Sequence, residues 1–272
     1  MGLQTLTGKR ALVTGSSGGI GRAIALALAR EGCEVMVHYH VRQTMAEETA
    51  QLIQEMSLCA GILQADFRDA LQIHRMMRQV DEIWPDGFDI LVNNAGVVTK
   101  LALEDDDDML SAWHETLQVN LHAPRLLSHL SVSRLRKRGE GGVILQVSSI
   151  HGEKSNEFIS PYAVSKSALD ALTRSMAIEY APSIRVNAVA PGVVPVERTA
   201  EAFKDNNSAE VVSWASRIPL KRLGTASEVA MVAVQLIIND WVTGAIWQVD
   251  GGMMARSNMP ERSRPFKAGG VC

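Results

Sequence analysis

The sequence predicts an α/β fold, a single-domain, doubly wound parallel β-sheet of about seven strands with helices on both faces. Short apolar runs rich in β-branched residues alternate with longer segments of helical periodicity along the chain, the order of elements expected in a doubly wound sheet. The apolar runs are almost continuously hydrophobic, as in strands buried on both faces of a parallel sheet. A glycine-rich turn joins the first run to the first helical segment, where such folds place it.

The strand candidates share this apolar, β-branched character and cover residues 11–14, 35–39, 62–65, 90–93, 143–147, 185–188 and 246–249. The helical candidates between them cover residues 20–30, 45–56, 70–83, 109–136, 161–180 and 227–238. Right-handed crossovers between successive strands would place these helices on both faces of the sheet.

No shift in composition divides the 272 residues, so residues 1–254 are predicted to form one domain. The segment 193–223 is too long for a simple connection and is interpreted as an inserted lid over a site. Residues 255–272 are interpreted as an extended C-terminal tail.

Composition argues against several classes of function. A net charge of −3 with 21% charged residues provides no basic field for nucleic acid or a membrane surface. No apolar run reaches the roughly 18 residues of a membrane-spanning helix, and the N-terminus lacks the apolar stretch of a signal peptide. The three cysteines are scattered, which suits a reducing cytoplasm. We therefore expect a cytoplasmic protein, and no residue cluster has the spacing of a metal site.

The turn after the first strand reads Thr14-Gly15-Ser16-Ser17-Gly18-Gly19-Ile20-Gly21. Glycines permit a tight turn and the close approach of a ligand. The amides that open the following helix are unpaired donors at the positive end of its dipole, which suits a phosphate group. The turn therefore predicts a Rossmann-type cradle for the pyrophosphate of a dinucleotide.

The end of the second strand predicts which dinucleotide is bound, because an acid there selects a free ribose 2′-hydroxyl and a cation selects a 2′-phosphate. The chain continues with Tyr39, His40 and Arg42, and the first acid is Glu47. Arg42 with His40 could pair with a phosphate, although Arg42 could equally be a solvated surface residue. We favour NADP(H) over NAD(H). After the third strand, Asp66 offers a carboxylate to the adenine amine, and the Phe67 ring can pack on the base.

A tyrosine and a lysine form the candidate catalytic pair. Tyr162 and Lys166 stand four residues apart in a predicted helix, so they share one face, and Ser149 lies thirteen residues upstream of Tyr162. A free phenol, with a pKa near 10, is a poor acid–base catalyst at neutral pH, and a neighbouring cation lowers its pKa. Bringing the phenol within reach of pH 7 requires about 4 kcal/mol at roughly 1.4 kcal/mol per pKa unit.

Taken in order, these motifs resemble the classical short-chain dehydrogenase/reductase family over about residues 6–254. The turn at residues 14–21 resembles its Thr-Gly-x-x-x-Gly-x-Gly signature, and Asn93-Asn94-Ala95-Gly96 resembles its motif after the fourth strand. Asn120, Ser149, Tyr162 and Lys166 match its catalytic residues, and Pro191-Gly192 matches its turn beside the nicotinamide. The resemblance implies cofactor contacts from Gly15, Ser17, Gly19, Ile20, Gly21, Tyr39, His40, Arg42, Asp66, Phe67, Asn93, Ala95, Gly96, Tyr162, Lys166, Pro191, Gly192 and Val194.

The resemblance also implies a mechanism. Tyr162 gives a proton to a carbonyl or takes one from an alcohol, while Ser149 hydrogen-bonds the substrate oxygen. Lys166 lowers the pKa of the phenol and binds the nicotinamide ribose, and Asn120 holds a water that links Lys166 to solvent. One departure concerns the hydroxyl residue usually found four places after the glycine of the Pro-Gly turn. That place is Val196 here, with Thr199 three residues later.

Two substrates and one non-catalytic role stay open. The segments at residues 148–154 and 178–182 resemble those of bacterial glucose 1-dehydrogenases, which favours a sugar. The overall pattern resembles a 3-oxoacyl-[acyl-carrier-protein] reductase almost as closely, and a basic group there would serve as a docking patch: Arg134, Arg136, Lys137 and Arg138. A dinucleotide-binding sensor without activity is the third possibility. The resemblance further implies a homotetramer.

Overall fold

A computed structural model describes residues 6–56, 58–100, 102–104, 106–139, 141–196 and 208–255. The described residues contain one parallel seven-stranded sheet with the strand order β3-β2-β1-β4-β5-β6-β7. Its strands are β1 (Arg10–Val13), β2 (Glu34–Tyr39), β3 (Ala60–Gln64), β4 (Ile90–Asn93), β5 (Gly142–Val147), β6 (Ile184–Pro191) and β7 (Ile246–Val249). The predicted Rossmann-type fold class is confirmed, and each predicted strand overlaps one of these.

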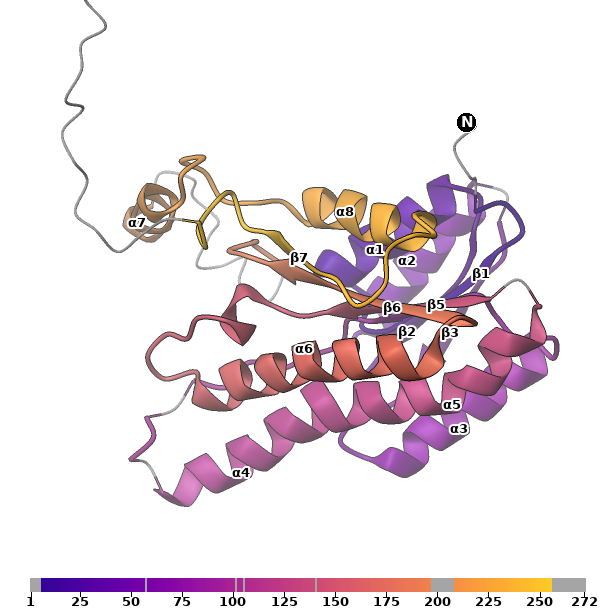
Figure 1. Ribbon diagram of the computed structural model, residues 1–272, viewed down its shortest axis with the longest axis horizontal. Helices are drawn as coiled ribbons and strands as arrows, with labels where there is room; N and C mark the ends of the chain where they lie inside the picture. Colours follow the sequence, from indigo (N-terminus) through magenta and orange to yellow (C-terminus); the bar gives the residue numbers. More distant parts are fainter. Residues whose placement is uncertain are drawn as a thin grey trace, which may run out of the picture.

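Helices cover both faces of the sheet (Figure 1). Those described are α1 (Gly19–Arg30), α2 (Gln43–Gln54), α3 (Ala70–Ile83), α4 (Asp106–Leu117), α5 (Ala123–Lys137), α6 (Ser160–Tyr180), α7 (Ala209–Arg217) and α8 (Ala226–Ile238). Helices α1, α2 and α8 lie above the sheet in Figure 1, and α3, α4, α5 and α6 lie below it.

The strands are mostly apolar because each face of the sheet has its own core. Val35 and Val37 of β2 belong to the cluster that packs under α1, α2 and α8. Met36, between them, belongs to the cluster on the opposite face, with residues of α3, α5 and α6. Successive strand side chains point to opposite faces, so a strand covered on both sides shows no polar alternation.

Two elements differ from the prediction. The segment expected as one helix over residues 109–136 is α4, a π-helical turn η1 (Gln118–His122) and α5 in direct succession. Helix α7 lies within the segment interpreted as a lid, whose residues 197–207 lie outside the described part, as does nearly all of the tail. No helix among the described residues is long and apolar enough to cross a membrane.

The strand order determines where a ligand can bind. The chain proceeds from β1 outward to β2 and β3, then returns to the other side of β1 for β4 and the strands after it. The loops that follow β1 and β4 therefore diverge and leave a crevice at the carboxyl ends of the strands.

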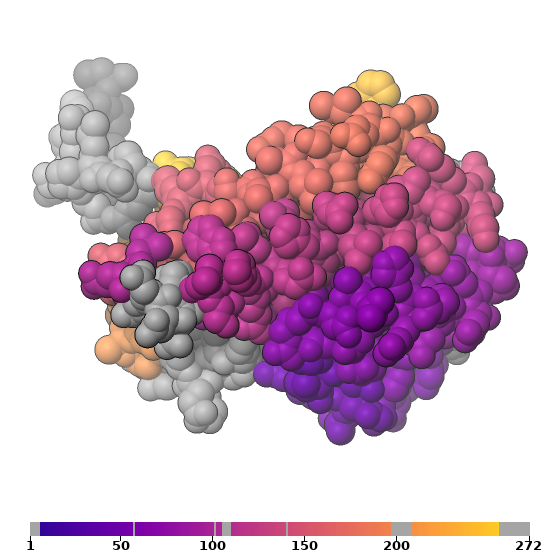
Figure 2. All heavy atoms as spheres, turned by 90° about the horizontal axis from the view of Figure 1, so that it is seen from below, coloured from indigo at the N-terminus to yellow at the C-terminus, as the bar shows by residue number. Residues whose placement is uncertain are grey.

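Figure 2 shows the helical face below the sheet, where the N-terminal third, in indigo and violet, adjoins the later helices, in magenta and salmon.

Candidate active site

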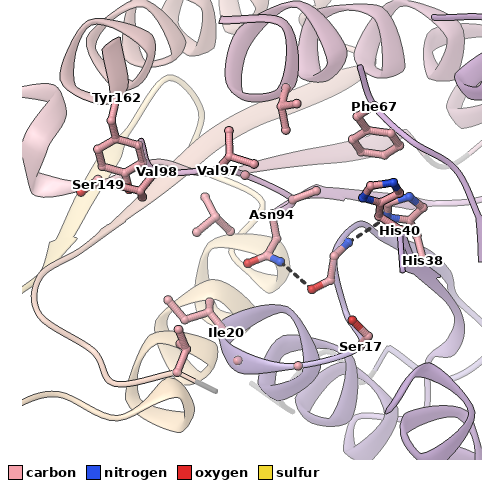
Figure 3. Close-up of a pocket in the computed structure, with 18 of the residues that line it drawn as sticks. Ser17, Ile20, His38, His40, Phe67, Asn94, Val97, Val98, Ser149 and Tyr162 are labelled. Atoms are coloured by element: carbon pink, nitrogen blue, oxygen red, sulfur yellow. Dashed lines mark hydrogen bonds between the residues drawn. The ribbon is translucent and has the colours of Figure 1, made fainter. Parts of the chain in front are cut away.

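The loops after β1 and β4 are joined to each other by hydrogen bonds. Thr14 Oγ1 donates to Val92 O at 3.1 Å and accepts from the backbone N–H groups of Asn94, at 2.9 Å, and Ala95, at 3.1 Å. The Asn94 amide nitrogen donates to the Gly15 carbonyl oxygen at 3.0 Å (Figure 3) and to the Thr14 carbonyl oxygen at 2.9 Å. These bonds fix the two sides of the crevice relative to each other.

The glycines of the first turn are required by backbone conformation and by close packing. Gly15 has a φ of +61°, and a Cβ at this position would lie 2.9 Å from Ala95 Cα. Gly21 packs against Asn94 and the Gly15 carbonyl, so a side chain there would collide with both. Helix α1 begins after Gly18, with no side-chain cap and no acidic residue in its first turn. Its first amides are therefore free of an intrinsic anion, as a pyrophosphate cradle requires.

A buried histidine ties the glycine turn to β2 and β3. His38 Nδ1 accepts from the Gly15 N–H at 3.0 Å, and its Nε2 lies 3.1 Å from Ala65 O (Figure 3). The two bonds are satisfied together only by the neutral ring with its proton on Nε2. The ring also stacks on Phe67 at 4.3 Å. Burial lowers the pKa of His38 from 6.5 to about 4, so the ring is neutral at physiological pH.

At the far end of the crevice, Asp66 is engaged by Arg68. The Arg68 guanidinium donates to both carboxylate oxygens at 2.7 to 2.9 Å, and its backbone N–H donates to Asp66 Oδ1 at 3.0 Å. The bonds from Arg68 hold the pKa of Asp66 below its ordinary value. His40 Nε2 lies 3.4 Å from Asp66 Oδ2 and 3.5 Å from Arg68 Nη2. The side chains of His40 and Arg68 thus flank the carboxylate that was expected to meet adenine.

Tyr162 and Lys166 lie on α6 with their side chains close together. The Lys166 ammonium is 5.7 Å from the centre of the Tyr162 ring and donates to Val147 O at 2.8 Å. Lys166 is only 4% exposed, whereas Tyr162 is half-buried. The bond to the last residue of β5 therefore holds the lysine head at the carboxyl end of the sheet, between the strand and the phenol.

The π-helical turn η1 carries Asn120 into the same region. Its amide nitrogen donates to Val97 O at 2.9 Å and to Ser165 Oγ at 3.1 Å, and its Oδ1 accepts from the Val97 N–H at 2.8 Å. Asn120 is fully buried. A Cβ added to Gly96 would lie 3.2 Å from Asn120 Oδ1 and 3.8 Å from Lys166 Nζ. Asn120 therefore lies behind Gly96, next to the lysine, and joins the loop after β4 to α6.

Ser149 follows β5 and precedes a short 3₁₀ turn, η2 (Ile150–Gly152). Its hydroxyl accepts from the His151 N–H at 3.2 Å. An accepting hydroxyl keeps its own proton free to donate, so Ser149 can give a hydrogen bond to a substrate oxygen. The His151 ring stands edge-on to the Tyr162 ring, with 6.1 Å between their centres, on the same side of the site.

These groups line one cavity of about 480 Å³ that runs from the glycine turn to Ser149 and Tyr162. Sixteen of the predicted site residues line it: Gly15, Ser17, Gly19, Ile20, His40, Arg42, Asp66, Phe67, Ala95, Gly96, Ser149, Tyr162, Lys166, Pro191, Gly192 and Val194. The other four predicted site residues do not line it: Gly21, Tyr39, Asn93 and Asn120. The Asn93 amide nitrogen donates to Ser128 Oγ at 3.2 Å. A cradle of glycine backbone at one end and a tyrosine–lysine pair at the other fit a dinucleotide.

Several residues in the cavity wall were not singled out from the sequence. Asn94 is part of the motif Asn93-Asn94-Ala95-Gly96, but nothing in the sequence distinguishes its role from those of its neighbours. His38 reads as an ordinary strand residue, and Arg68 as a surface charge. Val196 also lines the cavity, in the place where a hydroxyl was expected, whereas Thr199 lies outside the described residues.

Comparison with known proteins gives a family for this arrangement. Residues 15–254 match the family model described as enoyl-(acyl carrier protein) reductase. Glucose 1-dehydrogenase 2 of Bacillus subtilis is 33% identical over 251 residues, covering 91% of this chain and 95% of the relative.

Two solved structures are similarly close. A short-chain dehydrogenase from Burkholderia cenocepacia in complex with NADP superposes with a TM-score of 0.83 at 32% identity, covering 92% of this chain and all of the other. A putative gluconate dehydrogenase from Agrobacterium tumefaciens has a TM-score of 0.85 at 31% identity, covering 93% and 98%. The chain thus belongs to the short-chain dehydrogenase/reductase family and is an NAD(P)-dependent oxidoreductase that acts on CH–OH groups.

Proposed function

We propose that the protein interconverts a secondary alcohol and a ketone on a hydroxyl-rich, sugar-like substrate, with Tyr162 as the acid–base residue. One observation carries this proposal: Tyr162, Lys166 and Ser149 meet at the end of the cavity that begins at the glycine turn. The nicotinamide ring, when bound, supplies or accepts the hydride. The chain itself must bind the substrate, orient its oxygen and move one proton.

The proton passes through the Tyr162 hydroxyl. During reduction Tyr162 donates to the carbonyl oxygen, and during oxidation the phenolate takes the proton from the alcohol. The Lys166 ammonium near the ring favours the phenolate electrostatically. Since Val147 O holds that ammonium at 2.8 Å, the charge keeps its place throughout the reaction. Ser149 donates a hydrogen bond to the oxygen on which charge develops.

The loop after Ser149 supports a hydroxyl-rich substrate. It is polar and largely exposed from residue 153 to 157, and two bonds anchor it to the C-terminal part of the domain. The Gln248 amide donates to Glu153 Oε2 at 2.5 Å, and Lys154 Nζ donates to Met254 O at 3.3 Å. With His151 beside Tyr162, the polar side chains of residues 155–157 are the candidates for hydrogen bonds to several hydroxyl groups. The similarity to a glucose 1-dehydrogenase points the same way.

The alternative substrate is a 3-oxoacyl group on acyl carrier protein, which the match to the enoyl-(acyl carrier protein) reductase family model supports. Its expected docking patch is largely engaged within the chain. Arg134 pairs with Asp81 and Arg138 with Asp89, while Arg136 donates to Ser183 Oγ and Lys137 to Pro85 O. Partnered charges are less available to an acidic carrier, so a sugar is favoured.

The cofactor proposal is NADP(H) in preference to NAD(H). His40, Arg42 and Arg68 line the cavity near the end of β2, where a 2′-phosphate would lie. No acidic side chain stands at the end of β2 itself, and Asp66 after β3 is already paired with Arg68. The NADP complex of the Burkholderia relative is consistent with this assignment.

One panel of assays tests the substrate and the cofactor together. The purified protein is incubated with NADP⁺ or NAD⁺ and sugars or simple secondary alcohols, and in reverse with NADPH or NADH and ketones or 3-oxoacyl thioesters. Turnover of a sugar with NADP⁺ at the highest kcat/KM supports the proposal. Preference for 3-oxoacyl thioesters would replace the substrate, and cofactor binding without any turnover would favour the sensor.

Tyr162→Phe tests the assigned proton carrier. We expect turnover to fall at least about 100-fold, in line with the usual contribution of general acid–base catalysis. Cofactor affinity should stay within about threefold, because only the phenolic oxygen is removed. Substantial residual turnover would contradict the role of Tyr162.

A further inference from the structure

A carboxylate that the mechanism does not use packs against the turn that follows Ser149. Asp170 is on α6, four residues after Lys166 and eight after Tyr162, so the three share one helix face. Asp170 is only 9% exposed. A buried acid on the catalytic face of a helix, one turn behind the lysine, requires a reason, because burial of a charge is unfavourable unless it is paired.

The Asp170 carboxylate faces the turn that carries Ser149. A Cβ added to Gly152 would lie 2.6 Å from Asp170 Oδ2 and 3.2 Å from the carbonyl carbon and oxygen of Lys166. The absence of a side chain at residue 152 therefore lets the carboxylate pack against the backbone of η2. Gly152 in turn donates its N–H to Ser149 O at 2.9 Å. Gly152 therefore links the Asp170 carboxylate to the backbone of the catalytic serine.

The second contact is with the residue before the catalytic serine. The Ser148 hydroxyl faces the carboxylate and favours its charged form, although neither Ser148 Oγ nor Asp170 Oδ1 completes a well-aligned hydrogen bond with a described group. Both atoms are buried. Asp170 thus lies against both ends of the segment Ser148–Gly152, whose second residue Ser149 has extended backbone, with φ −164° and ψ 155°.

The electrostatic surroundings leave this carboxylate sensitive to pH. Burial is the largest influence and raises the pKa of Asp170 above its ordinary value, while Ser148, Arg174 and Lys166 favour the charged form and Glu153 opposes it. Arg174 and Lys166 lie on α6 itself, and Glu153 comes directly after η2. When Asp170 is protonated, its electrostatic attraction for the Ser148 hydroxyl weakens, while the packing of the side chain against Gly152 is unchanged.

We propose that Asp170 is a positioning residue for Ser149: its carboxylate, packed between Ser148 and Gly152, holds the segment from residue 148 to residue 152 at the distance from α6 at which the Ser149 hydroxyl meets the oxygen bound by Tyr162. The proposal rests on the proposed catalytic role of Ser149. It assigns Asp170 no contact with substrate or cofactor. The same contact explains why residue 152 must lack a side chain.

Three variants test this role with any alcohol that the wild type oxidises. Asp170→Ala removes the carboxylate, Asp170→Asn keeps its size without its charge, and Glu179→Gln is a matched control because Glu179 is an exposed acid on the same helix. We expect Asp170→Ala to lower kcat about tenfold, since a displacement of 1 Å at a reacting group can cost about 100-fold. Cofactor affinity should change less than about twofold, and the control should match the wild type.

The pH profile and a double-mutant cycle separate positioning from simple stabilisation. Wild-type kcat should decline on the acid side as Asp170 is protonated, and Asp170→Asn should lack that part of the decline. Gly152→Ala alone should lower kcat, but by a smaller factor in the Asp170→Ala background, because the added methyl group no longer meets the carboxylate. Independent effects, or a kcat for Asp170→Ala within twofold of the wild type, would overturn the proposal.

A measurement without turnover keeps this test apart from the substrate assignment. Hydrogen–deuterium exchange of peptides covering residues 147–153 should be faster in Asp170→Asn than in the wild type, with exchange in β1 and α1 unchanged. If the wild type oxidises another alcohol but no sugar, the substrate proposal fails and the positioning role is still measured. Unchanged exchange in residues 147–153 would reject the positioning role whatever the substrate.

Discussion

The buried His38 ring makes the stability of the cofactor cradle depend on pH. In the folded protein the ring is neutral, with Nδ1 accepting from Gly15 N–H and Nε2 bonded to Ala65 O. A proton on Nδ1 would face the Gly15 N–H, which is also a donor. Because the pKa falls from 6.5 to about 4 on folding, the unfolded chain binds more protons than the folded one between these values. Stability is therefore complete above about pH 6.5 and is lost as pH falls towards 4.

The size of this loss follows from the pKa difference. At about 1.4 kcal/mol per unit, a difference of about 2.5 units corresponds to about 3.4 kcal/mol, reached in full only below pH 4. Between pH 8 and pH 5 the same linkage gives a loss of about 2 kcal/mol. His38 is only 2% exposed, so solvent screening reduces this value little.

Urea unfolding of the wild type and of His38→Asn at several pH values measures the effect. His38→Asn should be less stable at pH 8, because the shorter side chain loses the bond from Nε2 to Ala65 O and the ring stacked on Phe67, but the difference from the wild type should shrink by about 2 kcal/mol at pH 5. His129→Asn, which removes an exposed histidine on α5, is the control and should run parallel to the wild type. Parallel curves for His38→Asn as well would refute a neutral, buried His38.

Two further substitutions test the crevice. Thr14→Val removes the acceptor of the Asn94 and Ala95 N–H groups, so the free energy of unfolding should fall by about 2 kcal/mol and cofactor should bind more weakly; unchanged denaturation and calorimetry would contradict the tie between the loops. Arg68→Ala should weaken NADPH binding more than NADH binding, as measured by titration of cofactor fluorescence. If NADPH and NADH lost the same affinity, Arg68 would interact with Asp66 but not with the 2′-phosphate.

The sequence identifies the elements of this fold well because their signals are local. A strand covered on two faces is mostly apolar, and its short run of apolar, β-branched residues overlaps each of the strands β1 to β7. The glycine turn was equally visible, since a positive φ at Gly15 excludes most other residues. The spacing of Tyr162 and Lys166 placed them on one helix face before any contact between them was known.

Other features have no local signal. The π-helical turn at Asn120 adds one residue to a helical turn, and the hydrophobic pattern of a long helix does not record that addition. The basic run from Arg134 to Arg138 could be a docking patch in the sequence. Only the fold brings Asp81 and Asp89 to it from segments about 50 residues away.

The sequence by itself therefore determined the fold class and predicted the dinucleotide cradle and the tyrosine–lysine pair, because backbone sterics and helical period act between near neighbours. The tertiary structure decided that His38 bonds to Gly15 after β1 and to Ala65 after β3, that Arg68 engages Asp66 at the cavity, and that Asp170 packs against Gly152. Burial, and with it the altered pKa of His38 and of Asp170, depends on what the rest of the chain packs around a side chain. The sequence by itself does not show which side chains the folded chain buries or which groups surround them.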